Sequence, residues 1–287
     1  MLLVFAMFSC KEDIVIDLEE GDPLIGVEGS FTDEFKCHEV ILRYTSDFYN
    51  ADEARMIRGA KVWVTDGVDT VEYFEREEQP GHYLTLPVAG HKRTHYTLLV
   101  DVPDEDEPDG FVHLTAESYM NDNVERIDSL VLKTNPLMSG FSPKDTLYLI
   151  YPYFQSLSDP SIIYMVHLTE HGVPRYDTLT DVFSIPVAGF AGYYVNGPEM
   201  LEHSMEIPVG MVFSSELTDG DTIRLDLLSI PRDYMIFTTE VKSSLGSNPL
   251  MGPPSNVSTN LRPEGKAVGF FYAASVASVE TVYHPKD

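Results

Sequence analysis

The stretch AKVWVTDGVDTVEYFE, residues 60–75, decides the fold class. Apolar and polar side chains alternate on both sides of Asp66-Gly67, as they do in two half-buried strands joined by a tight turn. An Asp-Gly pair suits such a turn because glycine adopts a positive φ without steric cost. The stretch therefore predicts a β-hairpin between residues 60–65 and 71–75.

The same pattern extends outward from the hairpin through the first half of the chain. Further short strands are expected at 23–29, 38–44, 81–84, 94–100 and 111–116. With the hairpin they make about seven strands at the spacing of an immunoglobulin-like sandwich. We expect the single tryptophan, Trp63, to fill the core of this sandwich, although strict alternation would instead turn Val62 and Val64 inward.

The second half of the chain is also rich in predicted strands. They are expected at 146–151, 162–168, 205–209, 222–228 and 267–273. One segment has a helical period instead: Pro231 suits a first helical turn, and apolar residues then recur on one face from Tyr234 to Leu245, before Gly246. This segment predicts one short helix in the C-terminal domain.

Alternation lapses at 121–126, which indicates a linker. The sequence therefore predicts an all-β chain of two tandem β-sandwich domains. The first is immunoglobulin-like and covers 23–121, and the second covers 122–287.

The N-terminus, MLLVFAMFSC, has the features of a lipoprotein signal. Residues 2–8 are continuously apolar but too short to cross a bilayer as a helix, and the small Ser9 precedes Cys10. We expect 1–9 to be a signal peptide, Cys10 to carry the lipid anchor, and 10–22 to form an acidic tether. The alternative is a buried N-terminal strand that ends in a core cysteine.

Composition limits the partners of the protein. Asp and Glu number 46 against 19 Lys and Arg, a formal net charge of -27 over 287 residues. Such a charge repels phosphate backbones, so nucleic acid is not expected as a partner. With Cys10 acylated, Cys37 is the only other cysteine, so no disulfide framework is expected and stability must come from packing.

Catalytic and metal-binding patterns are weak. Two histidine pairs have four-residue spacing but fall on a predicted strand and a turn, where solvent-exposed pairs are the better interpretation: His167 with His171, and His91 with His95. Cys37 and His38 are adjacent, so on a strand they would point to opposite faces. Nucleophile-elbow, Walker and dinucleotide motifs do not occur in the sequence. We therefore expect a protein that is not an enzyme and needs no cofactor.

Two loops are candidates for binding. The acidic loop 101–110 could offer Asp104, Asp106 and Asp109 to calcium, although a solvated acidic turn is the favoured alternative. The proline-rich loop 246–261 presents Leu250, Met251 and Asn256, which we expect to bind a ligand or partner. The alternative is that its apolar residues pack back onto the sandwich.

Several motifs occur in an order that resembles a known family. They are PLIGVEGSFT at 23–32, RIDSL at 126–130, SDPSIIY at 158–164, PPSNVSTNL at 253–261 and VGFFYAAS at 268–275. This order is similar to that of the Bacteroidota outer-membrane lipoprotein family labelled domain of unknown function 4249. The resemblance implies a lipid-anchored outer-membrane protein, often encoded near TonB-dependent transporters, and it supplies no catalytic residues.

Two functions are expected from this resemblance and from the charge. The first is a surface-exposed, non-enzymatic binding or accessory module for a TonB-dependent uptake system, with the transporter as its partner. The alternative is a structural or adhesive cell-surface protein that offers edge strands for assembly.

Overall fold

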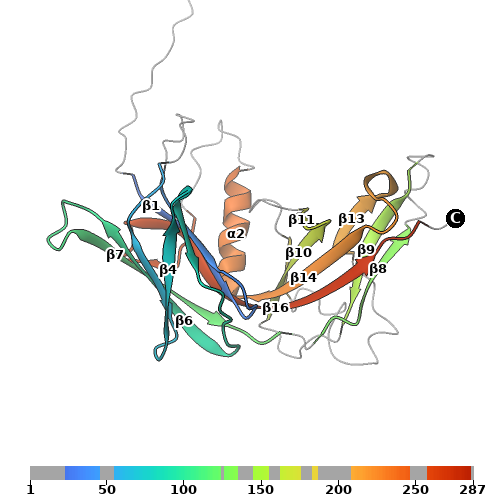
Figure 1. Cartoon of the computed structure of the whole chain (residues 1–287), viewed down its shortest axis with the longest axis horizontal. Helices are drawn as coiled ribbons and strands as arrows, with labels where there is room; N and C mark the ends of the chain where they lie inside the picture. Colours follow the sequence, from blue (N-terminus) through green and yellow to red (C-terminus); the bar gives the residue numbers. More distant parts are fainter. Residues whose placement is uncertain are drawn as a thin grey trace, which may run out of the picture.

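The computed structural model describes residues 23–45, 55–123, 126–134, 145–154, 162–175, 183–186, 208–245 and 257–285. Within these ranges the molecule is built almost wholly of strands, with one α-helix, α2 (Arg232–Leu245) (Figure 1). The all-β class and the helix predicted to follow Pro231 are therefore confirmed.

The first seven strands form the N-terminal half. They are β1 (Ile25–Thr32), β2 (Glu39–Tyr44), β3 (Lys61–Thr65), β4 (Thr70–Arg76), β5 (Gln79–Thr85), β6 (Thr94–Pro103) and β7 (Phe111–Met120). Their order in space is β1-β2-β5-β4-β3-β6-β7. Lettered A to G, this is the ABED and CFG order of a constant-type immunoglobulin sandwich, with the β3–β4 hairpin linking its two sheets.

Strict alternation prevails over residue size inside this hairpin. Val62 and Val64 are buried in the core, whereas Trp63 lies half-buried on the opposite face, opposite Glu72 of β4 and Leu99 of β6. The expectation that Trp63 fills the core is therefore wrong. A strand with a two-residue period cannot turn the middle residue of three inward without turning both neighbours outward.

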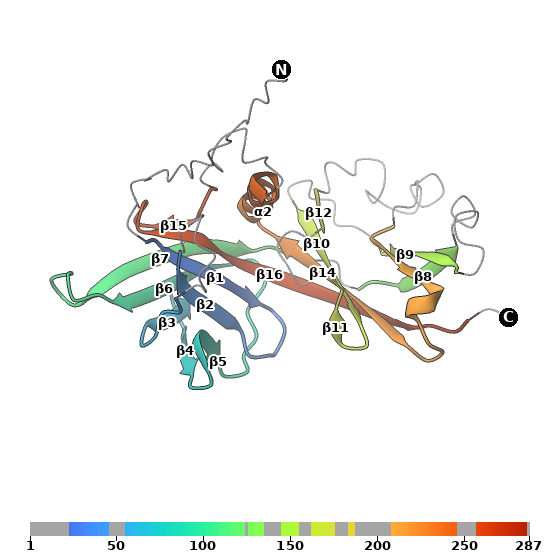
Figure 2. The ribbon, with the colours of Figure 1, turned by 90° about the horizontal axis from the view of Figure 1, so that it is seen from above.

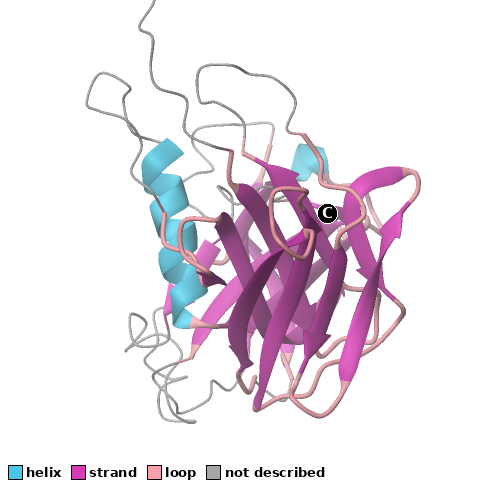
Figure 3. Cartoon of the chain, turned by 90° about the vertical axis from the view of Figure 1, so that its left-hand side faces the viewer, coloured by secondary structure: helices cyan, strands magenta, loops and turns pink. Residues whose placement is uncertain are grey.

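The remaining strands are β8 (Ser129–Thr134), β9 (Leu147–Tyr153), β10 (Ile163–Glu170), β11 (Val173–Pro174), β12 (Phe183–Pro186), β13 (Gly210–Phe213), β14 (Thr222–Ile230), β15 (Leu261–Arg262) and β16 (Ala267–Val282). A 3-10 turn, η2 (Ser214–Glu216), follows β13. β10, β14 and β16 form a layer with a separate apolar cluster on each face. The small sheet β13-β9-β8 covers one face, and α2 lies on the other (Figure 1). Figure 3 shows the helix standing beside the strands.

β16 belongs to both halves of the molecule. Its first eight residues pair in parallel with β1, from Ala267 beside Ile25 onward, and its last eight pair antiparallel with β14. Figure 2 shows this strand running from the N-terminal sandwich to the small sheet. One hydrogen-bonded path thus runs through both halves, and Phe271 and Ala273 complete the core of the N-terminal half.

A side-chain amide joins β16 to β7. Asn260 Nδ2 donates to the carbonyl oxygens of Glu117 on β7 (3.0 Å) and Phe271 on β16 (2.7 Å), while Phe271 N donates to Asn260 Oδ1 (3.2 Å). The hydroxyl of Ser118 accepts a further bond from Ala273 N at 2.7 Å. These bonds satisfy backbone groups where two strand edges meet without pairing.

Candidate ligand-binding groove

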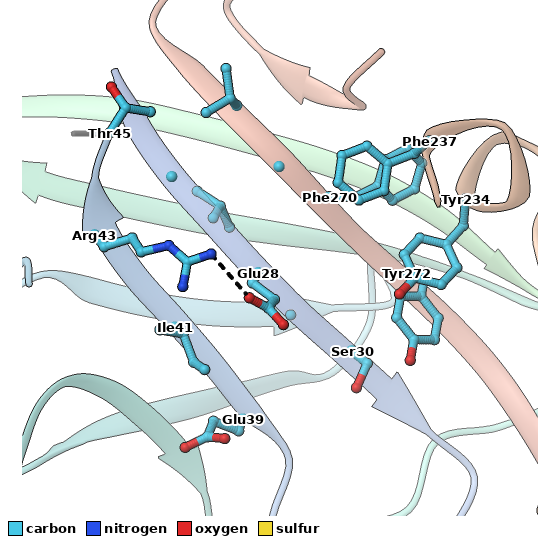
Figure 4. A pocket seen from close by; sticks show the side chains of 15 residues that line it. Glu28, Ser30, Glu39, Ile41, Arg43, Thr45, Tyr234, Phe237, Phe270 and Tyr272 are labelled. Atoms are coloured by element: carbon cyan, nitrogen blue, oxygen red, sulfur yellow. Dashed lines mark hydrogen bonds and ion pairs between the residues drawn. The ribbon is translucent and has the colours of Figure 1, made fainter. Parts of the chain in front are cut away.

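The strand β1 presents two different faces. Ile25, Val27 and Phe31 enter the sandwich core, whereas Gly26, Glu28 and Ser30 face outward because successive residues of a strand point to opposite sides. The outward residues line a groove of about 320 Å³ between β1, β2, β16 and α2 (Figure 4). The groove is therefore built on the solvent-facing side of the sandwich, beside the only α-helix in the described ranges.

Cross-strand rows set the order of the groove floor. Val268, Gly26 and Arg43 form one row across β16, β1 and β2. Phe270, Glu28 and Ile41 form the next. Tyr272 and Ser30 continue the series, and Glu39 lies one step further along β2 from Ile41 on the same face. The strand register thus brings residues more than 200 positions apart in the sequence side by side.

Two glycines in the floor of the groove leave space above the sheet and allow its strands to approach closely. A Cβ on Gly26 would lie 3.1 Å from the carbonyl oxygen of Arg43. Gly269 has a φ of +104°, and a Cβ there would lie only 2.0 Å from the carbonyl oxygen of Val27. Only glycine allows β16 to approach β1 this closely, and the absence of side chains leaves space above the sheet.

Aromatic rings form the wall beside α2. Tyr234 of the helix stacks on Tyr272 of β16 with 3.9 Å between ring centroids, and the Phe237 and Phe270 rings are 5.2 Å apart (Figure 4). Burial raises the pKa of Tyr272 to about 12 and also raises that of Tyr234. Both hydroxyls are therefore neutral at physiological pH and serve as hydrogen-bonding groups.

Charged groups lie along the opposite side of the groove. Arg43 Nη2 contacts Glu28 Oε2 at 3.4 Å, and the two side chains are 48% and 51% exposed. His82 Nδ1 of β5 lies 2.9 Å from Glu39 Oε1. Because an exposed pair at this distance gains little energy, the Glu28 carboxylate remains available to another partner. The groove thus combines an apolar wall with polar groups that could orient a ligand.

The acidic loop arranges its carboxylates for contacts within the protein. Asp104 Oδ1 accepts a bond from Asp106 N at 2.9 Å, while Asp109 Oδ2 lies 2.7 Å from His113 Nε2. His113 Nδ1 also lies 2.6 Å from Asp101 Oδ1, and the two hydrogen bonds raise the pKa of His113 to about 9. In the part of the chain that the structure describes, no three His, Cys, Asp or Glu side chains are placed to hold a metal ion.

The histidine pairs do not converge on a common site. His171 lies 2.7 Å from Asp221, and His167 pairs across the sheet with Asp226, with its pKa lowered by burial. Cys37 is exposed whereas His38 is buried. Both residues lie in the connection between β1 and β2, outside the strands, so the alternation expected for a strand does not apply to them.

Other candidates lie outside the described residues. These are Cys10, Leu250, Met251 and Asn256. The end of the proline-rich loop is described, and there Ser258 N and Oγ contact the Glu240 carboxylate of α2 at 2.6 and 3.1 Å. None of the helices in the ranges described is long and apolar enough to cross a membrane.

Sequence reasoning missed the groove residues. One signal was present: Glu28 and Ser30 alternate with apolar residues within the motif at 23–32, which marks a wet face of β1. Nothing local indicated that Tyr234 and Tyr272 would stand beside that face.

Comparison with known proteins defines the family. The family model described as a domain of unknown function (DUF4249) matches residues 11–280. The chain belongs to this family. The resemblance inferred from the ordered motifs is thereby confirmed, and the match spans both halves of the DUF4249 protein described above.

The other comparisons do not point to a function. A search among curated proteins finds no match. A solved chain described as a cytokine receptor complex is 12% identical with a TM-score of 0.24, and the alignment covers 73% of this chain and 86% of that one. A mutant Salmonella alpha-2-macroglobulin is 12% identical with a TM-score of 0.22, covering 92% of this chain and 15% of that one.

Proposed function

We propose that this protein is a non-enzymatic binding module whose ligand occupies the groove between α2 and strands β1, β2 and β16. The observation that carries the proposal is the lining of the groove. Stacked aromatic rings stand on one side, and the exposed Glu28 and Arg43 and the half-buried Glu39 lie on the other, around a space of about 320 Å³. Apolar surface with a few placed polar groups is the usual composition of a ligand site.

The scaffold around the groove supports this function. Its lining residues stand on paired strands and on a helix, whose backbones are held by hydrogen bonds and by two apolar clusters. A site on such elements keeps its geometry without a ligand, so less ordering entropy is lost on binding. Rigid placement therefore favours recognition.

We further propose that the module works at the outer membrane, anchored through a lipid on Cys10 and exposed at the cell surface. In this setting it would serve as an accessory to a TonB-dependent uptake system. The support is the lipoprotein-like N-terminal sequence, the acidic tether and membership of the DUF4249 family.

Filling the groove tests the binding role. Ser30→Trp places a large ring in the groove, and the matched control Thr115→Trp places one on the exposed face of β7. Each full-length protein is used to capture partners from detergent-solubilised outer membrane, with identification by mass spectrometry. We expect a TonB-dependent transporter, or the ligand that it imports, to be captured by the wild type and the control but lost with Ser30→Trp.

Equal capture by all three proteins would refute the groove as the binding site. Such a result would favour the structural or adhesive alternative, which does not use the groove. Cell fractionation tests the anchor separately: Cys10→Ala is expected to release the protein from membranes, and a variant that stays bound would contradict lipidation at this position.

A further inference from the structure

We infer that the groove recognises an organic cation, namely a primary ammonium or guanidinium on an apolar stem, as in a lysine or arginine side chain of a peptide. This inference rests on the proposed function, since it names the chemistry of the ligand for the same groove. The argument follows from the placement of the charges, the position of the rings and the charge of the whole protein.

The first step is the position of the carboxylates. Glu28 on β1 lies directly opposite Ile41 on β2, so Arg43 and Glu39 are its two diagonal neighbours on the same face. Diagonal neighbours on paired strands are about 7–8 Å apart, a spacing that long side chains can bridge and that suits a cation placed between two carboxylates. Glu28 therefore has a cationic neighbour on one side and a like charge on the other.

The second step is the unequal neutralisation of these charges. Among the described residues Glu28 has only the long, exposed contact with Arg43, and Glu39 is met by an imidazole that carries a full charge only when protonated. Bringing two carboxylates together costs free energy that a ligand cation would offset. The net charge of -27 also attracts cations toward the surface and repels anions.

The third step is the place for the stem of the ligand. Tyr272 stands beside Ser30, one row from Glu28, and stacks on Tyr234. Aromatic rings attract ammonium and guanidinium groups and also pack against the methylene groups that carry them. A lysine or arginine side chain laid across this wall would place its charge near the carboxylates.

Peptide titration tests this inference. The probes are a blocked tripeptide with a central lysine, its arginine analogue, and the same lysine peptide acetylated on the side-chain nitrogen. Binding to the full chain is followed by ligand-observed NMR at low and at high salt. We expect the two cationic peptides to bind and to weaken with salt, and the acetylated peptide to bind at least about tenfold more weakly.

Variants assign the effect to the groove. Glu28→Gln and Glu39→Gln should each weaken the lysine peptide about tenfold, whereas Glu72→Gln, an exposed control on β4, should leave binding unchanged. Arg43→Gln should strengthen binding because it removes a competing cation. Equal binding of the acetylated peptide, or unchanged binding to both glutamine variants in the groove, would overturn the inference.

The outcomes also separate this inference from the proposed function. If Ser30→Trp abolishes partner capture but no cationic peptide binds, the groove is a binding site for another class of ligand and only the inference fails. If Ser30→Trp leaves capture intact, the proposed function fails, and the inference that rests on it fails with it.

Discussion

The two halves of the molecule bury their strands in different ways. In the N-terminal half each strand has one core face and one wet face, and β7 alternates between buried and exposed residues along nearly its whole length. In the C-terminal half β10 begins with four consecutive buried residues, and β14 ends with four. The change occurs where α2 covers the face opposite the small sheet.

This difference shows that a run of buried apolar residues reports what covers a strand. A strand covered on both faces loses its alternation, whereas a strand covered on one face keeps it. β16 passes from the core of the N-terminal half to the position beneath α2 and then to the small sheet, so its middle is buried on both faces and its end alternates again. The predictions below test how far the two halves depend on this shared strand.

The largest effect is expected for Phe271→Ala. Phe271 is 0% exposed in the N-terminal core, and its removal should lower the free energy of unfolding by about 3–5 kcal/mol. Met165→Ala, equally buried beneath α2, should cost about 2–5 kcal/mol. If β16 couples the halves, urea unfolding followed by circular dichroism will show one transition that both variants shift. Two transitions, each shifted by one variant only, would show that the halves are independent.

Gly269→Ala tests the contact between β16 and β1. The positive φ and the approach of Val27 O predict a loss of at least about 1–3 kcal/mol in the free energy of unfolding. Gly67→Ala is the matched control, since its φ is +90° but no described residue lies within 4 Å of an added Cβ. Chemical denaturation should show the larger loss for Gly269→Ala. Equal losses would mean that only the backbone angle matters.

Asn260→Asp tests the joint between β7 and β16. The carboxylate can still accept from Phe271 N but cannot donate to the carbonyl oxygens of Glu117 and Phe271. We expect a loss of about 1–3 kcal/mol, because two backbone acceptors lose their donor. Hydrogen exchange should accelerate in β7 and β16 but not in β3 and β4. Uniform acceleration would contradict a local role.

Replacing either of two buried tyrosines in the N-terminal core by phenylalanine should affect the free energy of unfolding differently. The Tyr83 hydroxyl donates to Ile57 O at 2.9 Å and accepts from Ala60 N at 3.0 Å, so Tyr83→Phe should cost about 1–2 kcal/mol. The Tyr73 hydroxyl has no hydrogen-bond partner within the described ranges. Tyr73→Phe should therefore leave stability unchanged or raise it by up to about 1 kcal/mol. Thermal unfolding of both variants checks the contrast, which a destabilised Tyr73→Phe would contradict.

The smallest effects are expected from two histidines whose pKa values shift in opposite directions. Burial lowers the pKa of His38. Its contribution to stability is therefore present above the unfolded-state pKa of 6.5 and is lost as pH falls through the folded-state pKa. Hydrogen bonds to Asp109 and Asp101 raise the pKa of His113 to about 9. Its contribution to stability is therefore present below pH 6.5 and is lost as pH rises through about 9. Melting temperatures of His113→Gln should approach those of the wild type across that range, and a constant difference would contradict the assignment.

Local pattern was sufficient for much of the fold. Alternation on either side of Asp66-Gly67 predicted β3 and β4, and the helical period after Pro231 predicted α2. Alternation also favoured the outward position of Trp63 that the structure shows, whereas the preference of large aromatic residues for burial did not. Both signals depend only on residues close in sequence, because the period of a strand or helix fixes which of these residues share a face.

The candidate groove could not be predicted in this way. Its floor pairs Glu28 with Phe270 and its wall brings Tyr234 to the same place, although these residues come from opposite ends of the chain. Periodicity tells which face of a strand is wet but not which strand lies beside it.

The sequence by itself determined the all-β class, the helix, the acidic charge and the family of this protein. Tertiary structure alone decided that β16 would join both halves and that its rings would line one groove together with the carboxylates of β1 and β2. The physical reason is that pairing between distant strands depends on the fit of whole faces and edges in the folded chain. No short segment carries that information.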